Sequence, residues 1–331
     1  MSLLLVSILT KFQLQELAVT FDAHGIDDDV LSQLTDENLR ELGVHQIGLR
    51  KKLLAAFSDE NLPHSQPVDR TPPVIVELSS SASVPPPVPM DAASIPAPQQ
   101  ATCTSPFLNS LGQRFVPIKP DVLICIWPTR VRDFQAFCDA TRVTCPDCDF
   151  DQTPDDPVVN VSWIDAFEFC RWLTAHESKL GTLPAGHFYD LPSDLDWSSA
   201  VGLVNEYGAT PEERSGKAKG YPWGAEFPPP PGAGNYHPTL QVEDYAETSP
   251  VGSFRANELG IHDLGGNVWE WCLDKYEPDS DHHVLRGASC FNDDPEFLLS
   301  SYRDRNSPGR RRNNNGFRVL LKKKPASNPW F

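Results

Sequence analysis

The first sixty residues carry apolar positions at helical spacing, in short runs rather than in one long helix. Leucine and phenylalanine recur three or four residues apart within each run, as from Leu14 to Phe21 and from Leu53 to Phe57. Thr35 suits a helix N-cap, because its hydroxyl can accept a backbone N–H, and Gly43 suits a helix C-terminus. We therefore predict four or five short helices between residues 12 and 57, in a compact all-α domain.

A second patterned region begins near Phe107, and two helices are legible in it. Ser162 with Asp165 forms an S-x-x-D capping box ahead of apolar residues at helical spacing, and Ser193 with Asp196 repeats the arrangement. The runs HHVLRG and GFRVLLK predict strands, whereas most of the chain after Tyr207 is rich in Gly, Pro and Asn and predicts loops. This pattern indicates an α+β fold with low regular secondary structure.

Between the two regions the composition changes to Pro, Ser, Ala and Val, as in SSSASVPPPVPMDAASIPAPQQ. Such a segment cannot bury enough apolar surface to offset the entropy lost on ordering, and its prolines favour extended polyproline II. We interpret it as a disordered linker; a proline-rich ligand for another domain is the alternative. The expected organisation is a helical domain at 8–58, a linker at 59–106, an α+β domain at 107–322 and a tail at 323–331.

Charge and hydropathy exclude several classes of function. The 331 residues carry a formal net charge of −17, so phosphates of nucleic acids and anionic membrane surfaces would repel the chain. No run approaches the roughly 20 apolar residues that a membrane-spanning helix needs. The apolar start also lacks the basic region of a signal peptide. We expect a cytoplasmic protein with no membrane span and no nucleic-acid partner.

The eight cysteines include one CxxC pair, Cys145 and Cys148. A zinc site would need a second pair of Cys or His at a suitable spacing, and the sequence offers none beside this one. We expect unpaired thiols in a reducing compartment, with a metal site or a disulfide as the alternative.

The string FDAHGIDDDVLSQLTDENLRELGVHQIGLRKKLLAAF in the N-terminal region resembles a sterile alpha motif (SAM) domain. The resemblance implies a five-helix bundle that associates with itself or with another SAM domain through one acidic and one basic surface. The alternative is that these charges only solvate short helices. Candidates for the acidic surface are Asp27, Asp28, Asp29, Asp36 and Glu37, and those for the basic surface are Arg50, Lys51 and Lys52.

The α+β region carries a set of motifs in a fixed order, including GNVWEW at 266–271, RGAS at 286–289 and GFR at 316–318. They resemble the bacterial formylglycine-generating enzyme, or sulfatase-modifying factor, family over about Phe107 to Lys322. The resemblance implies a C-type-lectin-like fold whose ordered loops are held by buried tryptophans. Trp269 and Trp271 alternate as in a strand, and we interpret them as core residues rather than ligand contacts.

The resemblance also specifies where catalytic groups would lie. Enzymes of the family bind copper through two cysteines, separated by four residues, that follow the RG[GA]S turn, and thiolates are suitable soft ligands. In this chain those positions hold Asn292 and Phe297, while Cys290 is displaced and Cys272 is not at a catalytic position. We expect no enzymatic activity. A copper or other metal-dependent oxidase that uses Cys272 or Cys290 is the alternative.

No cofactor is expected to be required, but the resemblance implies candidate oxygen ligands for structural calcium. The alternative is that these groups bond to loop amides without a metal. One set comprises Asp263, the backbones of Gly266 and Val268, and Glu270; the second comprises Asn235 and Glu243.

Residues 286–319, which begin RGASCFNDDPEFLLSSYRDRNSPGRRRNNNGFR, resemble the variable region of proteins diversified by retroelements. In that family adenine-directed mutagenesis changes asparagine codons, and the altered side chains cluster on one exposed ligand-binding face. The resemblance implies a non-catalytic recognition module for an unidentified protein or other macromolecule; a structural scaffold without a diversified face is the alternative. Candidate contact residues are Cys290, Phe291, Asn292, Tyr302, Asp304, Asn306, Ser307, Gly309, Arg310 and Arg312.

Two features of this segment have simpler interpretations. In the simpler interpretation of the arginines, they form a solvated basic loop. For Asn313 to Asn315 we favour turns made by hydrogen bonds from side chain to backbone. For Phe291, Tyr302 and Arg310 we favour ligand binding, because exposed aromatic and arginine side chains supply large contact areas and forked donors. The arginines concerned are Arg303, Arg305, Arg310, Arg311 and Arg312.

Overall fold

The computed structural model describes residues 34–35, 39, 53–54 and 96–324, and the chain divides into two compact units, 1–94 and 95–331. In the first unit Leu39 and Leu53 are buried, and the Leu39 N–H donates to the carbonyl of Thr35. The remainder of the expected five-helix bundle, with the charged residues of its two expected surfaces, lies outside the described residues.

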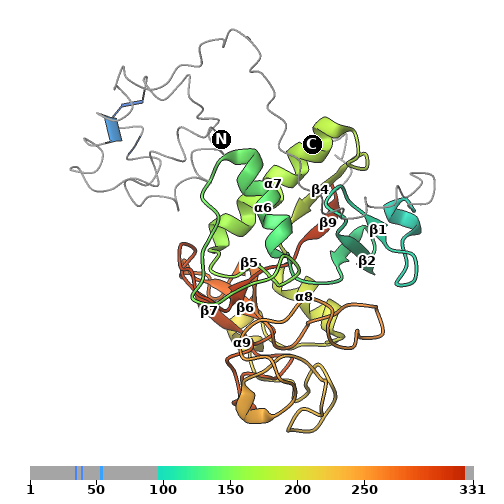
Figure 1. Ribbon diagram of the computed structural model, residues 1–331, viewed down its shortest axis with the longest axis vertical. Coiled ribbons are helices and arrows are strands. Elements are labelled where there is room, and N and C mark those ends of the chain that lie inside the picture. Colours follow the sequence, from blue (N-terminus) through green and yellow to red (C-terminus); the bar gives the residue numbers. More distant parts are fainter. Residues whose placement is uncertain (1–33, 36–38, 40–52, 55–95, 325–331) are drawn as a thin grey trace, which may run out of the picture. The chain divides into compact units, whose positions relative to one another are not determined.

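The second unit contains two sheets (Figure 1). The five-stranded sheet is antiparallel throughout, and its strand β9 pairs with both β3 and β4. In the four-stranded sheet β8 is parallel to β5 and the other pairs are antiparallel. In spatial order the first sheet consists of β1 (Phe107–Leu108), β2 (Arg114–Lys119), β3 (Val122–Cys125), β9 (Leu320–Lys323) and β4 (His187–Asp190), and the second of β7 (Asp304–Asn306), β6 (His283–Arg286), β5 (Trp269–Lys275) and β8 (Asn315–Gly316).

Two helices begin where the sequence predicts. In α7 (Trp163–Leu180) the Ser162 hydroxyl accepts the N–H of Asp165 at 3.1 Å, and in α8 (Asp194–Val201) the Ser193 hydroxyl accepts the N–H of Asp196 at 3.1 Å. Both capping boxes are therefore confirmed. Each helix ends at a glycine in the left-handed conformation, which costs glycine little because it has no Cβ.

The expectation of two helices was incomplete. The structure adds α6 (Val131–Thr141), the short α9 (Pro211–Arg214) and two 3₁₀ turns, η3 (Pro98–Gln100) and η4 (Pro238–Leu240). The residue before α6 is Arg130, not a typical N-cap; instead the Asp133 carboxylate accepts the Arg130 backbone N–H at 3.1 Å and its Nε at 2.9 Å. An arginine is not a start signal in sequence, so the helix went unrecognised.

Ordered structure begins before Phe107. Pro98 lies in η3, and both Pro98 and Ala101 are buried in the second unit. The last part of the segment expected to be linker therefore packs on the folded unit.

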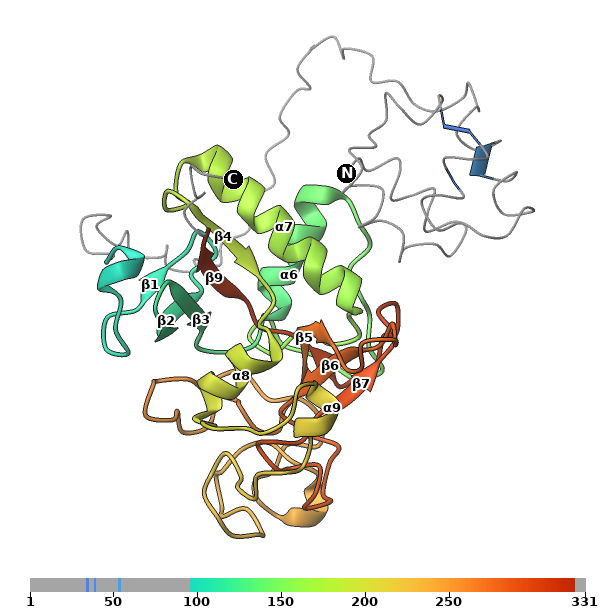
Figure 2. The same ribbon diagram turned by 180° about the vertical axis from the view of Figure 1, so that it is seen from behind.

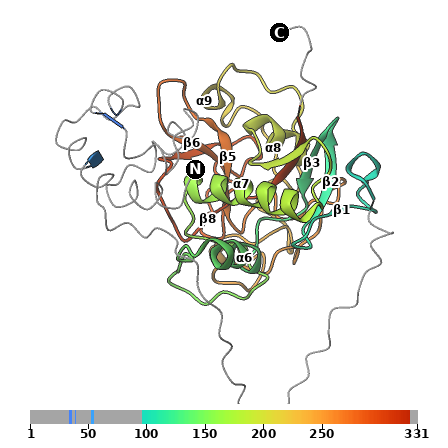
Figure 3. The same cartoon turned by 90° about the horizontal axis from the view of Figure 1, so that it is seen from above.

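Helices pack on both sheets, and the buried apolar residues form two clusters that each contain residues of both sheets. α7 packs against β4 and β5, and α8 contacts β2, β5 and β6; Figures 2 and 3 show α6 beside α7. Trp269 and Trp271 of β5 are buried, and the Trp271 indole donates to the carbonyl of Val161 at 3.0 Å. The interpretation of these tryptophans as core residues is confirmed.

No helix in the described part of the chain is both long and apolar enough to cross a membrane.

Candidate recognition site

Three arginines anchor the segment 286–319 in the interior. Arg286, Arg303 and Arg318 are 0 %, 1 % and 0 % exposed. A buried guanidinium is costly unless a carboxylate pairs with it, so the partners of these three residues determine how the segment is held.

Asp194, the first residue of α8, binds two of these arginines and also Arg214. Its Oδ1 accepts Nη1 of Arg286 and, at 3.0 Å, Nε of Arg303, while its Oδ2 accepts Nε of Arg214 at 3.1 Å. Glu206 completes the cluster by accepting Nη1 of Arg303 at 2.6 Å and Nη2 at 2.8 Å. The interpretation of Arg303 as a solvated loop residue is therefore wrong.

Charge within this cluster controls the ionisation of Asp194. Burial alone would raise the pKa of Asp194, but the guanidinium groups of Arg286, Arg303 and Arg214 outweigh it and lower that pKa from 3.8 to about 2. Asp194 is thus ionised at neutral pH and holds the start of α8 against the end of β6 and the residue that precedes β7.

The third arginine joins the two most recognisable motifs of the sequence. Arg318, from GFR, donates to Glu270, from GNVWEW, through Nε at 2.7 Å and through Nη2 at 2.6 Å. The Trp197 indole adds a third donor to the same carboxylate at 3.0 Å. This fork-to-fork pair closes β5 on the segment that leads into β9.

Side chains of the first candidate calcium set have hydrogen-bond partners within the protein. The carboxylate of Glu270 is engaged by Arg318, whose Nη2 also donates to the Asp263 carbonyl at 3.0 Å. The Asp263 carboxylate accepts the Gly252 N–H at 2.7 Å, and Gly266, at φ +79°, donates its N–H to the Gly287 carbonyl at 2.8 Å. Val268 is buried, and the Arg318 guanidinium contacts both the Glu270 carboxylate and the Asp263 carbonyl.

The second candidate set is more favourable to a cation. The Oδ1 atom of Asn235 is buried and has no hydrogen-bond partner among the described residues. The Glu243 carboxylate accepts the N–H of Tyr245. In the described part of the chain, however, no three His, Cys, Asp or Glu side chains gather as a metal site.

The two ends of the segment 286–319 meet around Trp269. Asn314 donates to the Ser289 hydroxyl at 3.1 Å, and its carbonyl accepts the Trp269 N–H at 2.8 Å. The Tyr302 ring lies 6.1 Å from that of Trp269, and its other neighbour is Phe297, with ring centroids 5.0 Å apart. Trp269, Tyr302 and Phe297 thus form a row of neighbouring rings that runs from the core to Phe297, which is 38 % exposed.

The later residues of the segment lie over the start of α7. The Pro308 carbonyl accepts the Ile164 N–H at 3.4 Å, and Arg311 makes a bidentate contact with Asp165, both distances being 2.8 Å. Gly309, Arg310 and Arg312 are exposed, and neither arginine forms an ion pair with a described residue. Asp304, Asn306 and Ser307 are half-buried, with the Asn306 Oδ1 accepting the Ser307 N–H.

The three consecutive asparagines lie at a local turn, as expected, because the Asn315 N–H donates to the Arg312 carbonyl at 3.0 Å. The side chains do not close this turn: Asn313 donates to the Asp149 carboxylate at 2.5 Å, Asn314 donates to Ser289, and Asn315 is 1 % exposed. The turn is therefore confirmed, but the expected bonds from side chain to backbone are replaced by side-chain bonds to residues far away in the sequence.

Family models match both parts of the chain. The model described as Sulfatase-modifying factor enzyme 1-like domain matches residues 109–323, which is more than half of the 331 residues. The chain belongs to the sulfatase-modifying factor enzyme 1-like family. The model described as SAM domain (Sterile alpha motif) matches residues 8–59.

Relatives in this family differ in what their names state. Inactive C-alpha-formylglycine-generating enzyme 2 from Bos taurus is 35 % identical over 140 residues, which cover 40 % of this chain and 38 % of the relative. Formylglycine-generating enzyme from Streptomyces coelicolor is 30 % identical over 186 residues, which cover 50 % of this chain and 52 % of the relative. The matches thus span only about two fifths to one half of each relative, and the family includes both active and inactive members.

A solved structure described as Treponema denticola variable protein 1 is 20 % identical, with a TM-score of 0.42 over 62 % of this chain and 84 % of that chain. Likeness at this level carries no information on function.

The positions of the sulfatase-modifying-factor cysteines have structural roles in this chain. The Asn292 Oδ1 accepts both the N–H of Ser289 at 3.0 Å and its hydroxyl at 2.8 Å, so Asn292 holds the RGAS turn. Phe297 packs on Tyr302. An amide and a phenyl ring offer no thiolate to a copper ion.

The two nearby cysteines are inaccessible. Cys290 and Cys272 are both 0 % exposed, and burial raises the pKa of Cys290 to about 12 and that of Cys272 well above its ordinary value. A reactive thiol needs exposure and a lowered pKa. Cys290 also cannot touch a ligand from this position, so its assignment as a contact residue is corrected; Phe291 beside it is 41 % exposed.

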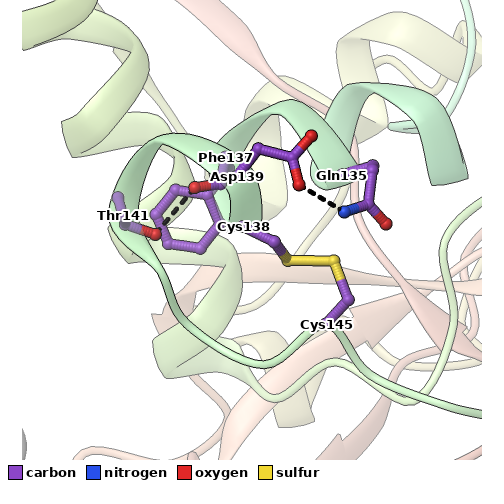
Figure 4. The surroundings of a disulfide bond; sticks show 6 residues. All are labelled: Gln135, Phe137, Cys138, Asp139, Thr141 and Cys145. Atoms are coloured by element: carbon purple, nitrogen blue, oxygen red, sulfur yellow. Dashed lines mark hydrogen bonds between the residues drawn. A yellow bond between two sulfur atoms is a disulfide. The ribbon is translucent and has the colours of Figure 1, made fainter. Parts of the chain in front are cut away.

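The CxxC pair is also corrected. Cys145 forms a disulfide with Cys138 of α6, with a Cα–Cα distance of 5.6 Å (Figure 4). Cys148 is a free thiol. The expectation of unpaired thiols therefore fails for Cys145, because its partner lies outside the CxxC motif.

Several residues of the site escaped sequence analysis, among them Asp194, Glu206 and Arg214. Asp194 follows a helix cap and reads locally as an acidic residue of the first helical turn. The LPSD string marks the cap but not the arginine partners, which lie up to 109 residues away.

Proposed function

We propose that the sulfatase-modifying-factor domain of this chain is a non-catalytic recognition module, whose ligand contacts come from exposed side chains of residues 286–319. One observation carries the proposal. Buried arginines anchor the segment at three points, while aromatic and arginine side chains between the anchors face solvent, and the two cysteine positions hold Asn292 and Phe297. The buried arginines that hold the segment are therefore present, whereas the two reactive cysteines of the family are replaced.

The chemistry of the exposed side chains favours a macromolecular ligand. Exposed Phe291 and Phe297 and half-buried Tyr302 supply rigid aromatic area, and Arg310 and Arg312 supply forked donors without a carboxylate among the described residues. Such side chains dominate the binding energy of protein interfaces. The unpaired arginines favour a protein that presents acidic groups.

Retroelement-directed variation of this segment is part of the proposal. The residues that depart from the Asn-rich pattern include Asp304, Ser307, Gly309, Arg310 and Arg312, which lie between the anchors rather than at them. Variation at such positions leaves the buried ion pairs unchanged. A reverse-transcriptase gene and an Asn-rich template repeat beside the 3′ end of this gene would support diversification, and their absence would favour a scaffold with a fixed surface.

A copper-dependent assay separates recognition from oxidase chemistry. We expect the protein, incubated with copper and a cysteine-containing peptide, to consume peptide thiol no faster than copper in buffer, because Cys272 and Cys290 are buried and protonated. Cys290→Ser and the exposed-thiol control Cys103→Ser should behave like the wild type. Protein-dependent thiol loss that persists in Cys103→Ser and disappears in Cys290→Ser would establish the oxidase instead.

We also propose that the SAM domain clusters copies of the recognition domain. Linking weak sites can raise the apparent affinity by about 10² to 10⁴ when the linker spans the ligands. A cytoplasmic location belongs to the same proposal. We assign candidate calcium ligation to Asn235 and Glu243, because the Glu270 carboxylate is engaged by Arg318.

Light scattering of the full chain tests the clustering. We expect a mass well above the 36.8 kDa of one chain, and two charge-reversed variants, Asp28→Lys with Asp29→Lys and Lys51→Glu with Lys52→Glu, that are each monomeric alone. Mixing the two variants should restore pairs, because each retains one intact surface. Wild-type chain that stays monomeric at every concentration would contradict self-association.

A further inference from the structure

An acidic loop lies against the basic end of the recognition site. Residues 145–151, called the acidic loop below, follow α6 and carry exposed Asp147, Asp149 and Asp151. Asp149 accepts the Asn313 side-chain N–H at 2.5 Å. The loop therefore contacts the segment that holds Arg310 and Arg312.

Asn160 joins the same two segments a second time. Its side chain donates to the Asp147 carbonyl at 2.5 Å, and its backbone N–H donates to the Arg312 carbonyl at 2.9 Å. Two contacts thus hold the acidic loop beside residues 312 and 313. Both require the backbone of the loop to stay in its present position.

The two ends of the loop are anchored differently. After the loop, the Gln152 side chain donates to the Pro157 carbonyl at 2.8 Å and to the Thr248 hydroxyl at 3.1 Å. Before it, the chain leaves α6 through Arg142 in the left-handed conformation and is tied back by the Cys138–Cys145 disulfide (Figure 4). Breaking that bond would leave the first half of the loop without its covalent anchor.

We propose that the Cys138–Cys145 disulfide is a redox-sensitive clamp that holds the acidic loop against residues 312–313 of the recognition site. The clamp itself can exist without a ligand, but its role in regulating recognition rests on the proposed function. With the bond intact, the Asp149 carboxylate accepts the Asn313 side-chain N–H and places negative charge beside the segment that holds Arg310 and Arg312. Reduction releases the loop and makes this end of the site accessible to an acidic ligand.

The reaction is a thiol–disulfide exchange with a low-molecular-weight thiol of the glutathione class. A thiolate attacks Sγ of Cys145, which is partly exposed, whereas Cys138 is 4 % exposed. The S–S bond breaks, and the Cys138 sulfur leaves as a thiolate and takes up a proton. A second thiol then cleaves the mixed disulfide, so that two protein thiols and one small disulfide are formed.

The neighbouring Cys148 does not replace the external thiol at neutral pH. Burial first, and then Asp147, Asp149 and Asp151, raise the pKa of Cys148, and its thiol donates to the Phe150 carbonyl at 3.0 Å. A protonated thiol is a poor nucleophile, so the clamp should respond to the surrounding thiol pool.

Hydrogen exchange of the full chain, in oxidised and in reduced glutathione, tests the clamp. We expect reduction to speed exchange in residues 143–149 and 312–315 by on the order of tenfold, because local opening becomes easier. Cys145→Ser should exchange fast in both conditions, and the matched exposed-thiol variant Cys103→Ser should respond like the wild type. Asn313→Ala should speed exchange in the loop while its disulfide stays intact by mass spectrometry.

Equal exchange in the oxidised and reduced wild type, or free Cys138 and Cys145 thiols in oxidised glutathione, would overturn the clamp. These outcomes need no ligand, so they are independent of the copper assay and of any binding measurement. A redox-responsive loop in a protein that oxidises peptide thiols would disprove the recognition function and leave the clamp standing.

Discussion

The substitution Asp194→Asn should lower the free energy of unfolding by about 3–5 kcal/mol, the range for breaking a buried ion pair. The change preserves the shape of the side chain but removes the charge shared by Arg286, Arg303 and Arg214. Glu206 still pairs with Arg303 in this variant, whereas Arg286 loses its ion pair with Asp194. Urea unfolding followed by tryptophan fluorescence measures the loss.

A matched exposed pair provides the control. Asp121 lies 3.6 Å from Lys323, with both side chains about half exposed, and Asp121→Asn should cost no more than about 1 kcal/mol. Equal losses in the two variants would mean that the Asp194 cluster does not hold the recognition segment in place.

The Asp194→Asn variant also tests the direction in which pH changes the stability of the protein. The arginines lower the pKa of Asp194 from 3.8 to about 2, so its stabilising contribution is complete above about pH 4 and is lost as the pH falls through about 2. The unfolding free energies of the wild type and Asp194→Asn should therefore converge between about pH 4 and pH 2. A constant difference across that range would assign the effect to something other than the charge of Asp194.

Local signals in the sequence predicted the elements that depend on local chemistry. The serine–aspartate capping boxes located α7 and α8, and the runs around His283 and Leu320 became β6 and β9. The helix α6 escaped because its cap is formed by Arg130 and Asp133, a combination with no start signal. The prediction failed where a stabilising contact came from a residue far away in the sequence or from a residue type that rarely makes it.

The site depended still more on distant partners. Arg303 and Arg310 belong to the same basic run, yet Arg303 is 1 % exposed and paired, whereas Arg310 faces solvent. Asp194, which decides the difference, lies 109 residues before Arg303. In the same way Cys145 pairs with Cys138 rather than with Cys148, because the end of α6 places Cys138 beside it. Spacing alone contains none of this information.

Gln in place of Glu270 should also cost about 3–5 kcal/mol, because Arg318 would remain buried with no carboxylate. Glu270 accepts three donors, two from Arg318 and one from Trp197, and a glutamine oxygen cannot replace both oxygens of the carboxylate. The two family motifs GNVWEW and GFR would then lose their direct link. Thermal and urea unfolding measure the change.

The Glu270→Gln experiment also decides between an arginine partner and a calcium partner when it is repeated with calcium and with a chelator. We expect the same loss in both conditions, because the Glu270 carboxylate is already satisfied by Arg318. The matched variant Glu277→Gln, whose exposed partner Arg305 is 4.0 Å away, should change stability by less than about 1 kcal/mol. A loss at Glu270 that appears only when calcium is present would instead show that the carboxylate binds metal.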